Sequence, residues 1–229
     1  INLNSMNKKC FIFDLDGVIV DTAKYHFQAW KSLANDLGID FNIDQNEQLK
    51  GVSRVKSLEK ILKWGGISLS ADEFENRMNQ KNASYLDYIA HMDTSELLPD
   101  VERVLEFLTQ NNQFITLGSA SKNARPILDK VKITGFFDAI VDGNDVSKAK
   151  PNPEVFLKAA RQTKSEPENC IVFEDSLAGI QAANAAGMIS VGIGNSAILQ
   201  EAKYNFKDFL SLTNEFIIEL IKEGNPNRL

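Results

Sequence analysis

The spacing of apolar residues along the chain follows two patterns. Short apolar runs bounded by glycine or acidic residues are typical of buried strands. They occur at 10–13, 114–118, 139–141, 170–173 and 190–193. Apolar residues at the three-to-four-residue spacing of a helix occupy 101–110, 123–131, 153–163, 177–186 and 216–222. Strands that alternate with helices in this way predict an α/β fold with a parallel sheet covered on both faces.

The stretch from 22 to 97 contains helical spacing only. Its apolar residues recur every three or four positions over 23–37, 54–64 and 71–89. Gly38 and the pair Gly65-Gly66 follow the first two segments and are expected to end them. This stretch is therefore predicted to be helical, without a strand.

These two patterns predict a core built from both ends of the chain. Residues 6–20 and 97–229 would form the α/β core, and residues 21–96 an all-helical unit inserted after the first strand. In open parallel sheets, ligands bind at the carboxyl ends of the strands. The inserted unit is expected to lie over that edge.

Composition narrows the class of protein. The 229 residues are 43% hydrophobic and 24% charged, which is typical of globular proteins. A formal net charge of −6 without a block of like charges argues against nucleic acid, and no apolar run approaches the roughly 20 residues that span a membrane. The two cysteines, Cys10 and Cys170, are expected to be buried and free. We expect a cytoplasmic monomer whose natural chain starts at Met6 and whose tail, 225–229, is loose.

Chemically active side chains follow several of the predicted strands. They are Asp14, Asp16, Ser119, Glu174 and Asp175, with Lys150 in a loop before a helix. Carboxylates brought together at one sheet edge repel unless a cation neutralises them, and hard oxygen ligands suit Mg²⁺. We predict a magnesium site at Asp14, Asp16, Glu174 and Asp175. Taken singly, Asp14 or Asp175 could equally cap a turn or a helix.

Together, these residues could catalyse phosphoryl transfer. Asp14 could attack phosphorus and become an aspartyl phosphate. Lys150 and the metal would stabilise charge on the transferring group, and Ser119 would donate a hydrogen bond to a phosphoryl oxygen. Asp16 could carry a proton to or from the leaving or attacking oxygen.

The motifs Asp14-Leu-Asp16-Gly17, Ser119, Lys150-Pro151 and Glu174-Asp175 resemble, in order and spacing, the four motifs of the haloacid dehalogenase superfamily. The resemblance covers almost the whole chain. It implies a Rossmann-like core with a helical cap inserted after the first motif, and Mg²⁺ as the metal.

Residues of the inserted unit and of the loop after the second strand are similar to those of the β-phosphoglucomutase family. That family interconverts β-glucose 1-phosphate and glucose 6-phosphate through bound glucose 1,6-bisphosphate. The substrate-binding residues implied by the resemblance are Thr22, His26, Trp30, Leu49, Gly51, Val52, Ser53, Arg54, Lys81, Ala120, Ser121, Lys122 and Asn123. A small-molecule sugar phosphate is the implied partner.

Several of these residues also have a physical rationale. The planar fork of Arg54 suits the distal phosphate of a bisphosphate, although a solvated helix-face arginine is the alternative. His26 lies one helical turn after Thr22, from where it could orient Asp16. Trp30 could contact the sugar or simply pack in a core. Lys81 is the weakest candidate, because a lysine on a helix is usually solvated.

Two other functions remain as alternatives. A hydrolase of the same superfamily, acting on a sugar phosphate or phosphoglycolate, would differ in letting water reach the aspartyl phosphate. A non-enzymatic phospho-acceptor switch would use Mg²⁺ and Asp14 alone. Arg54 and the run 119–123 speak against the hydrolase, and Asp16 and the large cap speak against the switch.

Overall fold

A computed structural model describes residues 8–223 of the chain. Its centre is a six-stranded sheet in the order β3-β2-β1-β4-β5-β6, with every neighbouring pair parallel. The strands are β1 (Cys10–Phe13), β2 (Phe114–Gly118), β3 (Ala139–Val141), β4 (Cys170–Glu174), β5 (Ile189–Ile193) and β6 (Tyr204–Phe206). The direction of winding reverses between β1 and β4, the switch point at which ligands bind in such folds. The α/β, Rossmann-like class predicted from the sequence is confirmed.

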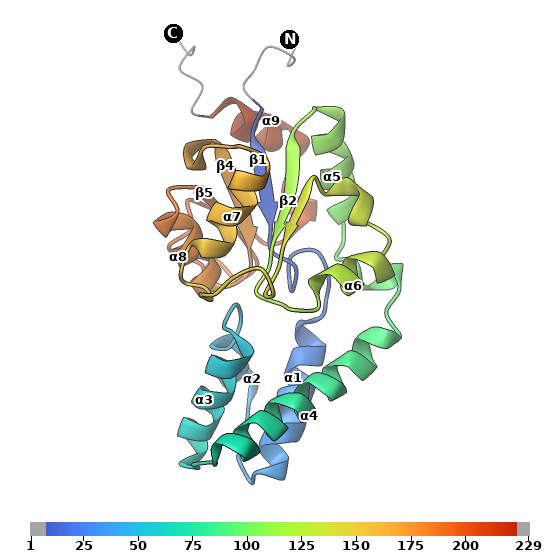
Figure 1. Ribbon diagram of the computed structural model, residues 1–229. Helices are drawn as coiled ribbons and strands as arrows, with labels where there is room; N and C mark the ends of the chain where they lie inside the picture. Colours follow the sequence, from blue (N-terminus) through green and yellow to red (C-terminus); the bar gives the residue numbers. More distant parts are fainter. Residues whose placement is uncertain (1–7, 224–229) are drawn as a thin grey trace.

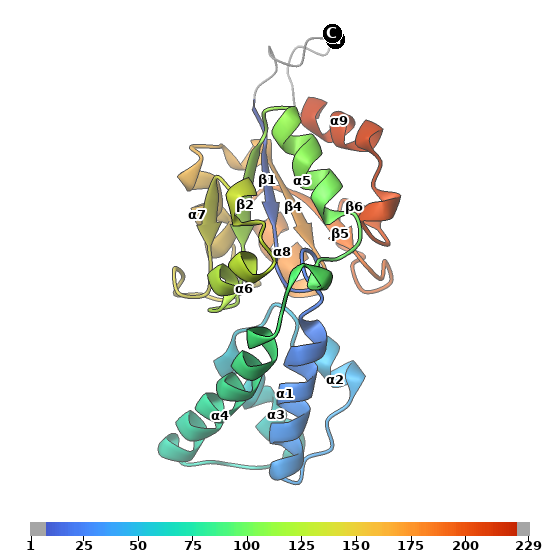
Figure 2. The ribbon, with the colours of Figure 1, turned by 90° about the vertical axis from the view of Figure 1, so that its right-hand side faces the viewer.

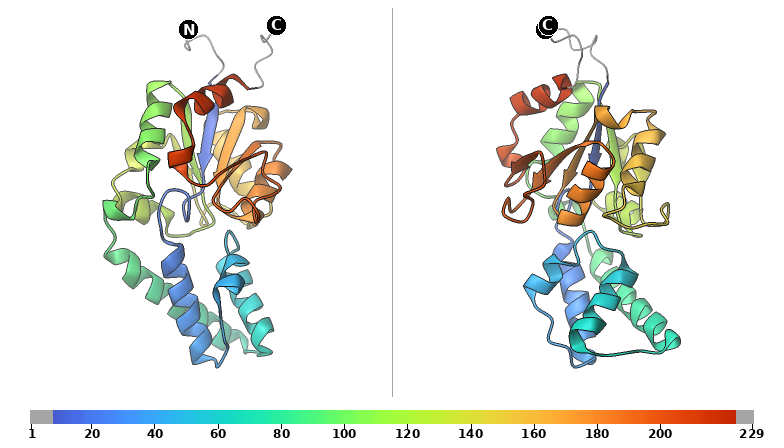
Figure 3. Two further views of the ribbon diagram at one scale, coloured as in Figure 1. Left: turned by 180° about the vertical axis from the view of Figure 1, so that it is seen from behind. Right: turned by 90° about the vertical axis from the view of Figure 1, so that its left-hand side faces the viewer.

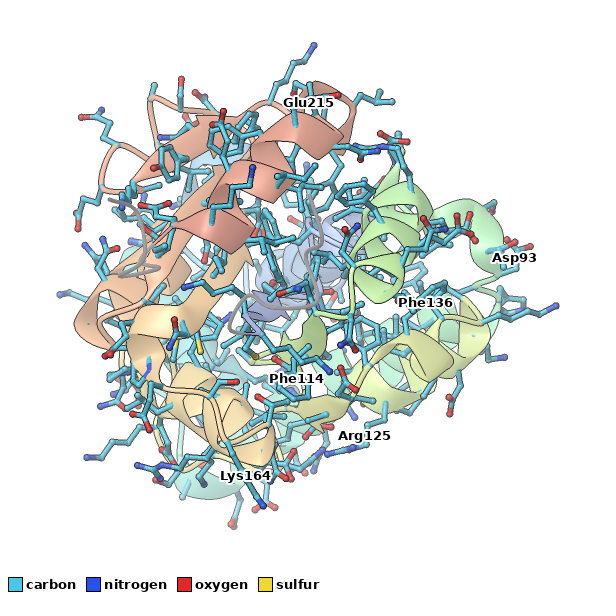
Figure 4. All side chains as sticks on the ribbon, turned by 90° about the horizontal axis from the view of Figure 1, so that it is seen from above. Asp93, Phe114, Arg125, Phe136, Lys164 and Glu215 are labelled. Atoms are coloured by element: carbon cyan, nitrogen blue, oxygen red, sulfur yellow. The ribbon has the colours of Figure 1, made fainter. Side chains whose placement is uncertain are left out.

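Helices cover both faces of this sheet (Figure 2). They are α5 (Val101–Gln110), α6 (Ala124–Lys130), α7 (Glu154–Gln162), α8 (Leu177–Ala185) and α9 (Asn214–Lys222), with single 3₁₀ turns η2 (Thr94–Glu96), η3 (Thr134–Phe136), η4 (Pro167–Asn169) and η5 (Phe209–Ser211). Figure 4 looks down on the amino-terminal edge of the sheet, where Phe114 of β2 lies between Glu215 of α9 and Lys164, which follows α7. The sheet is therefore the middle layer of three.

The pleat of the central strands explains why both faces are covered. Along β1, Phe11 and Phe13 point into a cluster shared with α5 and α9, while Cys10 and Ile12 point into a cluster shared with α7 and α8. All four side chains are fully buried. A continuous apolar run is what a strand buried on both faces requires.

Helices α1 to α4 form a separate group beyond the carboxyl ends of the strands (Figures 1 and 3). They are α1 (Ala23–Asp36), α2 (Ile43–Glu47), α3 (Arg54–Gly65) and α4 (Ala71–Ala90). This group has its own apolar cluster, which includes Trp30, Phe41 and Ile61. Val20 and Leu97 form an isolated antiparallel bridge where the chain leaves and re-enters the core. We propose that 21–96 form a cap unit and that 8–20 and 97–223 belong to the core.

The predicted elements agree with the structure to within about two residues at each end, whereas α2, β6 and the 3₁₀ turns η2 to η5 were not predicted. The helical ends at Gly38 and Gly66 are left-handed, with φ of 70° and 64°. Cys10 and Cys170 are buried and free. Met6 and the tail 225–229 lie outside the described residues. None of the helices within 8–223 combines the length and the apolar character needed to cross a membrane.

Candidate active site

The loop after β1 places two aspartates at the switch point of the sheet. The backbone N–H of Asp14 donates to the carbonyl of Phe173 at 3.0 Å, which continues the pairing of β1 with β4. The chain then turns at Gly17, whose φ is +80° and whose N–H donates to Val20 at 2.9 Å. A Cβ at Gly17 would lie 2.2 Å from Oδ2 of Asp175. Only glycine allows both this turn and this close approach.

The buried ammonium of Lys150 contacts two carboxylates, and a third, that of Asp175, lies close to those two. Lys150 Nζ lies 2.6 Å from Asp14 Oδ1 and 2.6 Å from Glu174 Oε1. The other Glu174 oxygen accepts from the backbone N–H and the hydroxyl of Ser176, both at 2.8 Å. Oxygens of Asp14, Glu174 and Asp175 lie within 4.8 Å of one another. The strand ends thus bring together three of the four predicted metal ligands, Asp14, Glu174 and Asp175, which we call the acidic group.

This acidic group suits a divalent cation. Burial raises the pKa of Asp14 well above its usual value, in spite of Lys150, and the neighbouring carboxylates raise it further. Burial likewise raises the pKa of Asp175 to about 7, against the opposing charge of Lys50. Mg²⁺ prefers hard oxygen ligands such as these carboxylates. A bound cation would also offset the unfavourable burial of their negative charges.

The Asp16 side chain is not among the three carboxylates grouped here, and the predicted part of Asp16 in the metal site stays a prediction. Asp16 Oδ1 instead accepts a hydrogen bond from the Thr22 hydroxyl, and His26 Nε2 faces the same oxygen at 3.7 Å. Asp16 lies two residues after Asp14 in an extended turn, and its carboxylate points toward the cap. The side-chain carboxylates that the structure groups are those of Asp14, Glu174 and Asp175.

Charge and hydrogen bonds keep Asp16 ionised. Burial alone would raise the pKa of Asp16, but the charge of His26 and the hydrogen bond from Thr22 outweigh burial, and its pKa lies below the usual value. An ionised carboxylate near neutral pH is ready to accept a proton. This state fits the general-base half of the predicted role.

Behind Asp16, four side chains from α1 and α4 pack against one another. The His26 ring stacks on Tyr85 with centroids 4.1 Å apart, and His26 Nδ1 lies 2.8 Å from Lys81 Nζ. Lys81 also sits over the rings of Trp30 and Tyr85, at 4.9 and 4.7 Å. Burial and the charge of Arg54 lower the pKa of Lys81 to about 7. Lys81, expected to be solvated, is instead 3% exposed.

The loop after β2 forms the opposite wall. Ser119 is buried, its N–H donates to Val141 at 3.0 Å, and its hydroxyl accepts from the N–H of Ser121 at 3.0 Å. The Ser121 hydroxyl in turn accepts from the N–H of Asn123 at 3.2 Å. The Asn123 amide reaches Asn82 of α4 at 3.5 Å. This hydrogen-bonded loop brings together the hydroxyl of Ser121, the ammonium of Lys122 and the amide of Asn123.

A cavity of about 890 Å³ lies between the cap and the core. The predicted residues that line it are Asp14, Asp16, His26, Trp30, Leu49, Gly51, Val52, Ser53, Arg54, Lys81, Ala120, Ser121, Lys122, Asn123, Lys150 and Asp175. Thr22, Ser119 and Glu174 are buried and stand behind its wall. Its volume is in the range of small-molecule sites.

Tyr85 and Lys50 are among the lining residues that carried no predicted role. Tyr85, one turn after Lys81 on α4, is 1% exposed, and its hydroxyl has no hydrogen-bond partner among the residues described. Lys50 Nζ lies 3.3 Å from Asp175 Oδ2. The helical spacing from Lys81 could have indicated Tyr85. Nothing in the local pattern distinguishes Lys50 from a solvated lysine.

Residues 8–187 match the family model of the haloacid dehalogenase-like hydrolases. The chain belongs to this family. The match includes the acidic group, Asp14, Glu174 and Asp175, and the loops 49–53 and 119–123 that line the cavity. It therefore agrees with the resemblance seen in the sequence motifs.

Within the haloacid dehalogenase-like family, the chain is similar to proteins of more than one activity. It is 42% identical over 213 residues to a β-phosphoglucomutase of Bacillus subtilis, covering 92% of this chain and 94% of that one. A crystal structure of β-phosphoglucomutase from Clostridium difficile matches with a TM-score of 0.90 and 42% identity, over 95% of this chain and 98% of the other. A fructose-1-phosphate phosphatase of Escherichia coli is 31% identical over 182 residues, 80% of this chain and 94% of the relative.

Proposed function

We propose that the chain is a phosphohexomutase that interconverts β-glucose 1-phosphate and glucose 6-phosphate. The proposal includes an aspartyl phosphate at Asp14, β-glucose 1,6-bisphosphate as the intermediate, and Mg²⁺ at Asp14, Glu174 and Asp175. The similarity to β-phosphoglucomutases over more than nine-tenths of the chain supports it. The cytoplasmic location and the monomeric state stay predictions.

The observation that carries the proposal is the position of Arg54. This half-buried side chain lines the same cavity as Asp14, and it has no ion pair or side-chain hydrogen bond within residues 8–223. A guanidinium without an anionic partner in a cavity is suited to a phosphate of the ligand. A substrate with a second phosphate, distant from the reacting phosphate, needs such a group. The substrate of a simple hydrolysis, with one phosphate, does not.

In the forward direction, the phosphoryl group starts on Asp14. The 6-hydroxyl of β-glucose 1-phosphate attacks phosphorus, a new P–O bond to the sugar forms, and the bond between phosphorus and the Asp14 oxygen breaks. Asp16 accepts the proton of the attacking hydroxyl. Lys150 stabilises negative charge on the transferring group and on Asp14.

The bisphosphate then reorients, and the reaction runs in reverse on its other end. Asp14 attacks the phosphorus at C1, the bond from that phosphorus to the sugar oxygen breaks, and Asp16 returns the proton to that oxygen. Arg54 holds whichever phosphate is not reacting. When bound, Mg²⁺ would supply Lewis-acid stabilisation of the phosphoryl oxygens.

The proposal predicts which product accumulates. With β-glucose 1-phosphate, Mg²⁺ and a trace of glucose 1,6-bisphosphate, we expect glucose 6-phosphate to form with no matching release of inorganic phosphate. Both products are measured in the same samples over time. Phosphate release without isomerised sugar would instead support the sugar-phosphate hydrolase, which the similarity to the fructose-1-phosphate phosphatase keeps as the second candidate.

Replacing Arg54 by alanine is expected to lower kcat/KM for β-glucose 1-phosphate by about 100-fold, because the non-reacting phosphate loses a bidentate charged partner and the sugar is misplaced. The Arg54→Lys variant keeps the charge but loses the planar guanidinium. Its kcat/KM should lie between those of the wild type and Arg54→Ala. Phosphorylation of Asp14 by acetyl phosphate, which has no distal phosphate, serves as the control and should be unchanged. An unchanged kcat/KM in Arg54→Ala would contradict the assignment.

A further inference from the structure

Lys50 connects the cap to the acidic group of the core. It follows α2 in the cap, and its Nζ lies 3.3 Å from Asp175 Oδ2 and 3.1 Å from Glu47 Oε1. Its side chain is 26% exposed and that of Asp175 is 10% exposed. Lys150 already pairs with Asp14 and Glu174. Each carboxylate of the acidic group therefore has a lysine partner, and one of the two lysines belongs to the cap.

The loop that carries Lys50 is packed closely against the core. Gly51 has a φ of +70°, and a Cβ there would lie 2.6 Å from the hydroxyl of Ser176, the residue after Asp175. The N–H of Val52 donates to Leu49 at 3.1 Å, and Lys60 donates to the carbonyl of Gln48 at 3.0 Å. The loop conformation thus holds the Lys50 backbone beside Asp175.

The two partners of Lys50 are not equivalent. Asp175 belongs to the group that would hold a cation, whereas Glu47 lies on the cap itself. A divalent cation at Asp175 would share that carboxylate with an ammonium of the same sign, which is unfavourable at short range. Glu47 offers Lys50 a partner to which it can turn without leaving the cap.

We propose that Lys50 is a displaceable counter-ion of the acidic group: it holds Asp175 while Mg²⁺ is absent and releases it to Glu47 when Mg²⁺ binds. Metal binding then competes with this contact between cap and core. Because such coupling is reciprocal, the contact weakens Mg²⁺ binding as much as Mg²⁺ weakens the contact. The inference rests on the proposed magnesium site and not on the mutase activity.

Mg²⁺ titration by calorimetry tests this competition on the metal-free protein. The Lys50→Met variant, similar in length but uncharged, is expected to bind Mg²⁺ about five-fold more tightly than the wild type. Lys50→Arg keeps the charge and should remain near the wild-type affinity. Lys63→Met removes a charge from an exposed position on α3 and serves as the matched control, with no change expected.

Amide hydrogen exchange measures the other half of the coupling. In the wild type, Mg²⁺ should speed exchange in the loop 49–53, while in Lys50→Met exchange there should be fast already and insensitive to Mg²⁺. Equal Mg²⁺ affinity of wild type and Lys50→Met, or wild-type exchange that ignores Mg²⁺, would overturn the role of Lys50 and leave the metal site intact. A wild type that does not bind Mg²⁺ would overturn the metal site as well. The product assay decides the mutase activity separately.

Discussion

Replacing Asp14 by asparagine is expected to reduce turnover of β-glucose 1-phosphate by at least about 10⁴-fold, because the amide cannot form the acyl phosphate on which both half-reactions depend. Asparagine keeps the size of the side chain in a site where Asp14 is 7% exposed. Steady-state rates and acid-quenched incorporation of labelled phosphate from acetyl phosphate both measure the loss. The incorporation should vanish together with the turnover.

The stability of the same variant separates lost chemistry from lost folding. Burial and three neighbouring carboxylates already raise the pKa of Asp14, so that its charge is unfavourable in the metal-free protein. Lys150 keeps its pair with Glu174 at 2.6 Å when Asp14 is neutral. We therefore expect a Tm equal to or above that of the wild type. Asp21→Asn, an exposed carboxylate in the same connecting segment, is the matched control and should keep full activity. Phosphate incorporation in Asp14→Asn would exclude Asp14 as the nucleophile.

The sequence predicted the core of the site because the burial of a parallel strand makes its end easy to recognise. An apolar run such as 10–13 must stop where the chain leaves the sheet, and the first polar residue after it is Asp14. The same reasoning applies to 114–118 with Ser119, and to 170–173 with Glu174. Parallel strands in one sheet bring these ends together whatever the connecting helices are.

Features that depend on tertiary contacts could not be predicted in this way. β6 is an edge strand of three partly exposed residues, Tyr204–Phe206, with little apolar signal of its own. Lys81 is buried because two aromatic rings and His26 surround it, and those partners come from α1 as well as α4. The hydrogen bond from the Thr22 hydroxyl to Asp16 also depends on the turn at Gly17. The type and spacing of residues along the chain specify neither the burial of Lys81 nor the hydrogen-bond partner of Asp16.

Replacing Asp16 by asparagine is expected to lower turnover by about 10²- to 10⁴-fold, because the sugar oxygen then loses the group that takes and returns its proton. Phosphorylation of Asp14 by acetyl phosphate should change far less, since acetate leaves without a proton. The phosphoenzyme should also last longer than in the wild type, because neither a sugar hydroxyl nor water is deprotonated during attack. Quenched-flow measurement of labelled protein follows both steps.

This combination of results distinguishes proton transfer from mere support of the fold. A structural role for Asp16 would lower phosphorylation and turnover together, because Thr22 and His26 would both lose the negative charge they face. A phospho-acceptor switch would form phospho-Asp14 in both proteins and turn over sugar phosphate in neither. Normal turnover in Asp16→Asn would remove Asp16 from the mechanism. Only an acid/base role predicts a variant that is phosphorylated readily and then fails to pass the phosphoryl group to the sugar.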